Sequence, residues 1–175
     1  KQKTAYELST RDWSSDVCSS DLKVMIAFEQ TCLELKPDLV IVVGDVNSTI
    51  ACALVAVKMG IKTAHVEAGL RSYDRSMPEE INRIATDAIC DYWFTTEESG
   101  NRILKESGFP EKHIFFVGNT MIDSLHFALP KAEQSTVLQE LDLKKGAYGL
   151  VTMHRPSNVD DPVQLQSLQI GRAHV

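Results

Sequence analysis

Residues 39–45 read LVIVVGD, five apolar residues followed by a glycine and an aspartate. An unbroken, mostly β-branched run of this length is typical of a parallel strand buried on both faces. The Gly-Asp pair predicts a turn into a helix from about Ser48 to Gly60, with Asn47 or Ser48 as its cap. A second strand is expected at 62–66, so the chain opens a β-α-β pattern.

The same alternation continues on both sides of this unit. Further helices are expected at 23–36, 78–90, 97–107 and 119–129, and further strands at 92–95 and 113–117. Strands that alternate with helices predict an α/β fold, a doubly wound parallel sheet of Rossmann-like type. After a weakly patterned stretch with a possible helix at 137–141, a new strand is expected at 148–152 and a helix near Asp160.

The two ends of the chain differ from the rest. DWSSDVCSSDL at 12–22 and IGRAHV at 170–175 back-translate to strings that resemble sequencing-library adapters, and KQKTAYE at 1–7 fits the outer primer. We therefore expect residues 1–22 and 170–175 to be adapter-derived tails, the alternative for 1–22 being a genuine Ser/Asp-rich tail. Residues 23–118 then form part of an N-terminal domain, and 119–169 a linker and the start of a second domain.

Composition excludes several classes of protein. The chain has 18 basic and 24 acidic residues, a net charge of −6, and no basic run, which argues against sequence-independent nucleic-acid binding. No apolar run reaches the roughly 20 residues that span a bilayer, so we expect no membrane association and a cytoplasmic location. Cys32, Cys52 and Cys90 lie in apolar helical patterns without paired spacing, as reduced buried thiols do. No cluster has metal-ligand spacing, and the signatures GxGxxG, GxxxxGK[ST], GxSxG and HExxH are absent from the sequence.

Polar side chains follow the predicted strands, where open α/β sheets bind their ligands. The residues that follow them are Asp45, Asn47, Glu67, His154 and Arg155; His65 lies within the strand at 62–66, and Glu79 and Arg83 lie at the start of the helix at 78–90. Carboxylates with a histidine suit proton transfer at carbon, and an arginine beside a helix start suits a phosphate.

Each of these residues also has an ordinary structural interpretation. Asp45 suits a helix cap, Glu67 the plain end of a strand, and His65 a satisfied core histidine. Glu79 and Arg83 have the i, i+4 spacing of a surface ion pair, and His154 with Arg155 suits an ordinary loop. The grouping at successive strand ends, and not any single residue, favours a catalytic site.

Five strings together resemble the non-hydrolysing UDP-N-acetylglucosamine 2-epimerases. They are GDVNST at 44–49, HVEAGLRS at 65–72, MPEEINR at 77–83, GNTMID at 118–123 and TMHRPSN at 152–158. The resemblance covers residues 23–169, and HVEAGLRS followed closely by PEEINR is its most specific part. The family's opening strand with a GTRPE-like loop and most of its UDP-binding domain have no counterpart in residues 23–169, and Val43 stands where many members have histidine.

The resemblance implies a truncated two-domain architecture of the glycosyltransferase-B type and interconversion of UDP-GlcNAc and UDP-ManNAc, for cell-surface polysaccharides. UDP is eliminated to give a 2-acetamidoglucal and is then re-added, with no metal or redox cofactor. The implied catalytic residues are Asp45, Glu67, Glu79 and His154, and the implied substrate-binding residues are Asn47, His65, Arg83, Asn119 and Arg155. The complete enzyme is expected to be a homodimer.

Other functions stay open. Within enzymes, the alternatives are a relative that acts on another UDP-sugar, such as a diacetamido-uronic acid, and the hydrolysing type, which releases free ManNAc. A glycosyltransferase shares the fold alone, which is weak support. A non-catalytic parallel-sheet module is the alternative from another class.

Overall fold

The computed structural model describes residues 17–153 and 156–170. It divides into two compact units, the first ending at Phe127 and the second beginning at Ala128. Each unit is described by itself. His154 and Arg155, two of the predicted site residues, lie outside the described residues.

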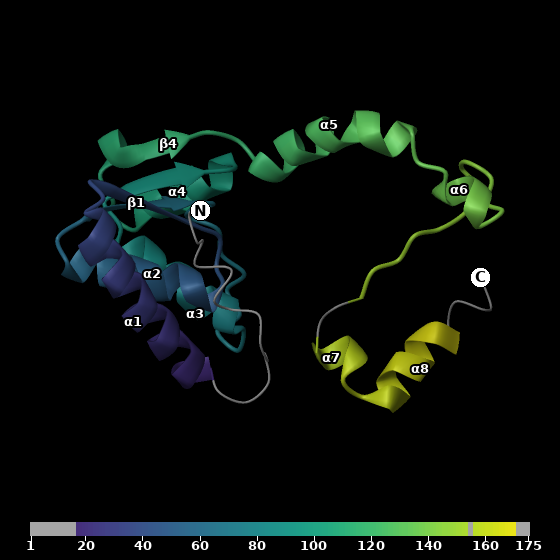
Figure 1. Cartoon of the computed structure of the whole chain (residues 1–175), viewed down its shortest axis with the longest axis horizontal. Coiled ribbons are helices and arrows are strands. Elements are labelled where there is room, and N and C mark those ends of the chain that lie inside the picture. Colours follow the sequence, from purple (N-terminus) through teal and green to yellow (C-terminus); the bar gives the residue numbers. More distant parts are fainter. Residues whose placement is uncertain (1–16, 154–155, 171–175) are drawn as a thin grey trace. The chain divides into compact units, whose positions relative to one another are not determined.

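The first unit is built on a four-stranded parallel sheet in the order β1-β2-β3-β4 (Figure 1). Its strands are β1 (Leu39–Val43), β2 (Lys62–Val66), β3 (Tyr92–Thr95) and β4 (Ile114–Phe116). The predicted bounds of the first three are confirmed, and the fourth is shorter than predicted by one residue at each end. The sheet and its helices confirm the Rossmann-like α/β class.

Four α-helices and a 3₁₀ turn complete the first unit before α5. They are α1 (Val17–Leu35), α2 (Asn47–Lys58), α3 (Pro78–Ile89), α4 (Glu98–Glu106) and the turn η2 (Glu111–His113). Helix α1 begins six residues before the predicted start at Lys23, because VCSSDL at 17–22 contains no proline or glycine to interrupt it. The origin of residues 1–22 stays a prediction.

Helices α1 to α4 pack on one face of the sheet. Val42, His65, Trp93 and Ile114 are register partners in successive strands, so their side chains share a face. On it, Val40 and Val42 pack with α1 and α2, while Trp93 and Ile114 pack with Leu104 of α4. Right-handed crossovers between strands in sequential order place all their helices on the same side.

The opposite face of β1 corrects one prediction. Leu39, Ile41 and Val43 are 44%, 57% and 55% exposed, so this strand is buried on one face and not on both. The apolar run predicts the strand correctly, but which faces are covered depends on the strand order.

The prediction of reduced, buried cysteines is confirmed, since Cys32, Cys52 and Cys90 are free and buried. Burial raises the pKa of Cys52 to about 11 and that of Cys90 to about 12, so both stay protonated near neutral pH.

The helices that follow the sheet are α5 (Thr120–Glu133), which runs from the first unit into the second, α6 (Val137–Glu140), α7 (Pro156–Val159) and α8 (Pro162–Ile170). Helix α5 continues through Pro130, beyond the predicted end at Leu129. The strand predicted at 148–152 is wrong: these residues form no strand, since a strand needs a partner for its backbone groups. No described helix is long and apolar enough to cross a membrane.

Candidate functional site

The site lies at the carboxyl ends of β1 and β2. Gly44 and Asp45 follow β1, and Glu67 follows β2, so adjacent parallel strands deliver them to the same edge. A Cβ placed on Gly44 would lie 3.5 Å from Glu67 Oε2. The Glu67 carboxylate therefore lies against the residue that precedes Asp45, as expected for two groups serving one site.

Glu67 has an unusual backbone. Its φ is +74°, in the left-handed region that residues other than glycine rarely adopt. Its N–H donates to the Phe94 carbonyl at 2.9 Å, so the neighbouring strand helps to hold this conformation. Such strain costs about 1–3 kcal/mol and occurs most often at functional sites.

Arg83 of α3 joins Asp45 to the helix. Its Nη2 donates to Asp45 Oδ2 at 2.6 Å and its Nη1 to Glu80 Oε2 at 2.6 Å. The guanidinium is 13% exposed and the Asp45 carboxylate 32%, which leaves Asp45 open to a ligand while fixing one of its oxygens. The predicted residues Asp45, Glu67 and Arg83 therefore belong to one arrangement.

Glu79 and Glu80 have different surroundings. Glu79, one of the predicted catalytic residues, is half-buried in the first turn of α3. Glu80 is buried and accepts from the N–H and hydroxyl of Ser72 and from the N–H of Tyr73. Burial alone would raise the pKa of Glu80, but these hydrogen bonds and the Arg83 charge lower it below its ordinary value. Arg83 therefore pairs three residues back along the helix, and among the described residues Glu79 forms no ion pair with it.

Asn47 is held by α3 as well. Asn82 Nδ2 donates to the Asp45 carbonyl and to Asn47 Oδ1, both at 2.9 Å. The predicted cap by Asn47 or Ser48 is wrong: helix α2 begins at Asn47 itself, after Val46, without a side-chain cap. The side-chain oxygen of Asn47 instead accepts from Asn82, which ties the start of α2 to α3.

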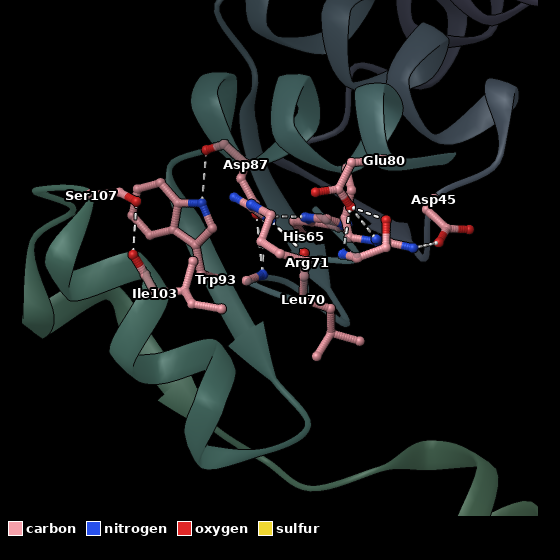
Figure 2. A network of polar contacts seen from close by, with 12 residues as sticks. Asp45, His65, Leu70, Arg71, Glu80, Asp87, Trp93, Ile103 and Ser107 are labelled. Atoms are coloured by element: carbon pink, nitrogen blue, oxygen red, sulfur yellow. Dashed lines mark hydrogen bonds and ion pairs between the residues drawn. The ribbon is translucent and has the colours of Figure 1, made fainter. Parts of the chain in front are cut away.

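His65 lies at the centre of a buried polar network (Figure 2). It is 0% exposed, with Nδ1 2.7 Å from Asp87 Oδ1 and Nε2 2.8 Å from the Gly44 carbonyl oxygen. Asp87 also accepts from the N–H of Gly69 and from Arg71 Nη1. Direct substrate binding, predicted for His65, does not fit a side chain with both nitrogens occupied and no exposed surface.

Sequence reasoning missed the residues of this network that come from α3 and the loop before it: Arg71, Glu80, Asn82 and Asp87. A signal for two of them was present. Glu80, Arg83 and Asp87 have the spacing i, i+3, i+7, which places them on one face of the helix. Because that face is polar and not apolar, a search for hydrophobic periodicity does not mark it as buried.

Asn119 caps a helix. Its Oδ1 accepts from the N–H of Met121 at 2.9 Å, at the start of α5. The substrate contact predicted for Asn119 remains a prediction, as do the roles of His154 and Arg155.

A cavity of about 390 Å³ adjoins Arg83. It is lined by Leu70, Arg71, Ser72, Tyr73, Arg83, Glu97, Ser99, Arg102 and Ile103.

In the part of the chain that the structure describes, no group of three or more His, Cys, Asp or Glu residues is arranged to hold a metal ion.

Comparison with known proteins identifies relatives of this chain. The family described as UDP-N-acetylglucosamine 2-epimerase matches residues 2–171. A UDP-N-acetylglucosamine 2-epimerase homolog of Methanococcus maripaludis is 49% identical over 142 residues, which are 80% of this chain and 40% of the relative. A UDP-2,3-diacetamido-2,3-dideoxy-D-glucuronate 2-epimerase of Pseudomonas aeruginosa is 42% identical, over 83% of this chain and 41% of its own.

Solved structures agree. The crystal structure of Methanocaldococcus jannaschii UDP-GlcNAc 2-epimerase in complex with UDP-GlcNAc and UDP superposes with a TM-score of 0.79 and 41% identity. The match covers 92% of this chain and 45% of that one. The chain spans about 40% of the length of the curated relatives it matches.

Proposed function

The chain belongs to the UDP-N-acetylglucosamine 2-epimerase family, and on that premise we propose that the complete enzyme inverts C2 of a UDP-sugar, converting UDP-GlcNAc to UDP-ManNAc. The observation that carries the proposal is the pair of carboxylates, Asp45 and Glu67, at adjacent strand ends. Inversion at C2 needs a base on one face of the sugar and an acid on the other, and two carboxylates supply both.

The first half of the proposed reaction is an elimination. A carboxylate takes the proton from C2, the C2–H electron pair forms the C1–C2 double bond, and the C1–O bond breaks so that UDP leaves with its electron pair. The products are a 2-acetamidoglucal and UDP. Asp45 and Glu67 are the candidates for the base, and the residues present do not distinguish them.

The second half reverses these steps on the other face. UDP adds back to C1, and a proton is delivered to C2 from the side opposite to the one that lost it. Glu79 is proposed to assist the proton transfers. His154 and Arg155 are proposed to bind the diphosphate and to stabilise departing UDP, since an arginine pairs with two phosphate oxygens at once.

The Arg83 ion pair positions the Asp45 carboxylate. Arg83 Nη2 donates to Oδ2 at 2.6 Å, while the Asp45 side chain stays 32% exposed and so remains open to a substrate. The strained backbone of Glu67 supports a functional role for that residue.

A second substrate has specific support. The Pseudomonas aeruginosa relative named for a diacetamido-glucuronate is 42% identical, close to the 45% of the Methanocaldococcus jannaschii UDP-N-acetylglucosamine 2-epimerase. The same two carboxylates would serve a UDP-linked diacetamido-uronic acid, because the chemistry at C2 is unchanged.

Identification of the products tests this proposal. The complete enzyme incubated with UDP-GlcNAc should give UDP-ManNAc, and turnover only of the diacetamido-uronate would select the second substrate. Free ManNAc plus UDP would favour the hydrolysing type, and transfer of the sugar to an acceptor a glycosyltransferase. We expect the 175-residue chain alone to be inactive in this assay, and turnover by it would contradict that expectation. The homodimer and the cytoplasmic location are part of the proposal, testable by sedimentation and by cell fractionation.

A further inference from the structure

The peptide unit of Gly44 is held from both sides by strand β2. The Gly44 N–H donates to the Val66 carbonyl at 3.0 Å, and the Gly44 carbonyl oxygen lies 2.8 Å from His65 Nε2. His65 and Val66 immediately precede Glu67, and Gly44 immediately precedes Asp45. The His65 side chain therefore makes one of the two contacts that fix one carboxylate relative to the other.

The contact with Gly44 fixes the role of one ring nitrogen of His65. A backbone carbonyl can only accept, so Nε2 must donate to Gly44. On the other side, Asp87 Oδ2 accepts from Arg71 Nη1 at 2.6 Å and from the Gly69 N–H at 3.1 Å. The other oxygen of Asp87, Oδ1, lies 2.7 Å from His65 Nδ1 and holds the ring in place.

The surroundings of the ring are closed. His65 is 0% exposed, the Asp87 side chain is 1% exposed, and the Trp93 indole N–H donates to the Asp87 carbonyl on the same side. Asp87 is the charged group that contacts the His65 ring, and Arg71 in turn contacts Asp87 (Figure 2). His65 therefore joins a buried carboxylate to the Gly44 carbonyl, an arrangement that a core histidine serving only to fill space does not need.

We propose that His65 is a positioning residue for the epimerisation: held by Asp87, it donates from Nε2 to the Gly44 carbonyl and so sets Asp45 against Glu67. The inference rests on the proposed function for its kinetic consequence, although not for the hydrogen bond from Nε2 to Gly44. It assigns His65 an indirect role in place of the substrate contact that sequence reasoning predicted.

Two substitutions in the complete enzyme separate the contacts. His65→Gln keeps an amide N–H that can reach the Gly44 carbonyl, whereas His65→Asn keeps a donor near Asp87 and leaves Gly44 without one. A misplacement of about 1 Å costs on the order of 100-fold in rate. We expect His65→Asn to lower kcat by about 100-fold with KM nearly unchanged, and His65→Gln to recover about tenfold of that loss.

Thermal melting of both variants is the control for a role in stability alone. If kcat of His65→Asn stays within about threefold of the wild type, or if both variants lose kcat equally while melting like the wild type, the proposal is wrong. Should either variant fail to fold, a ¹⁵N spectrum of the wild-type enzyme decides. A hydrogen on Nε2 of His65 at pH 7 supports the proposal, and its absence overturns it. The spectrum does not depend on activity, so a failure of the epimerase assignment remains distinguishable.

Discussion

Replacing Glu67 by glutamine in the complete enzyme should lower kcat by about 1000-fold or more, with KM within a few-fold of the wild type. The amide keeps the shape of the side chain and its place beside Gly44 but can neither take nor deliver a proton at C2. General acid–base catalysis contributes about 10²–10⁴ in rate, which sets the size of the loss. Steady-state kinetics with UDP-GlcNAc measure it.

The matched control is Glu106→Gln, the same chemical change at an exposed position in the last turn of α4. It should leave kcat unchanged. Asp45→Asn should cause a loss of the same order as Glu67→Gln. If Glu67→Gln and Asp45→Asn both left the rate within about tenfold of the wild type, the carboxylates would not be catalytic, and a non-catalytic module would become the better description.

Substituting Gly69 with alanine should destabilise the first unit by about 3 kcal/mol or more, a large fraction of the roughly 5–15 kcal/mol by which ordinary proteins are stable. A Cβ on Gly69 would lie 2.5 Å from the Gly100 carbonyl oxygen and 2.9 Å from the Gly100 Cα, both backbone atoms of α4. Gly69 also has a φ of +80°, which costs an alanine about 1–2 kcal/mol. Overpacking against backbone adds about 1–3 kcal/mol. Urea unfolding measures the change.

Gly60→Ala separates the two effects. Gly60 has a φ of +75°, but a Cβ there meets no atom within 4 Å. We expect it to lose only the conformational part, about 1–2 kcal/mol. If both alanine variants were equally stable, the close approach of the loop after β2 to α4 would not be a constraint.

Local sequence patterns predict the strands well. The run at 39–43 is bounded by Pro37-Asp38 and Gly44-Asp45, so its bounds follow from residues that cannot extend it. The run at 148–152 looks similar and is not a strand, because pairing depends on distant residues that periodicity does not reveal. The exposed face of β1 is missed for the same reason, since it follows from the order of the strands.

The residues of the site also fall into two groups, those whose positions follow from local sequence and those whose roles depend on tertiary packing. The positions of Asp45 and Glu67 at strand ends follow from the α/β pattern and are confirmed. The partner of Arg83 is not local in this sense: Glu79 and Glu80 both lie within reach, and the rotation of α3 against the sheet buries Glu80. Asp87 becomes the partner of His65 only when α3 packs beside β2, so its role is a property of the tertiary structure.

The most direct test of the central claim is turnover of UDP-GlcNAc by the complete enzyme in D2O, followed by mass spectrometry and NMR of the recovered UDP-ManNAc. Elimination removes the C2 proton to a carboxylate that exchanges with solvent, so the proposal predicts one deuterium, located at C2 of the product. Product that is formed at the normal rate but carries no deuterium would contradict proton removal at C2 with solvent exchange, and with it the proposed role of Asp45 and Glu67.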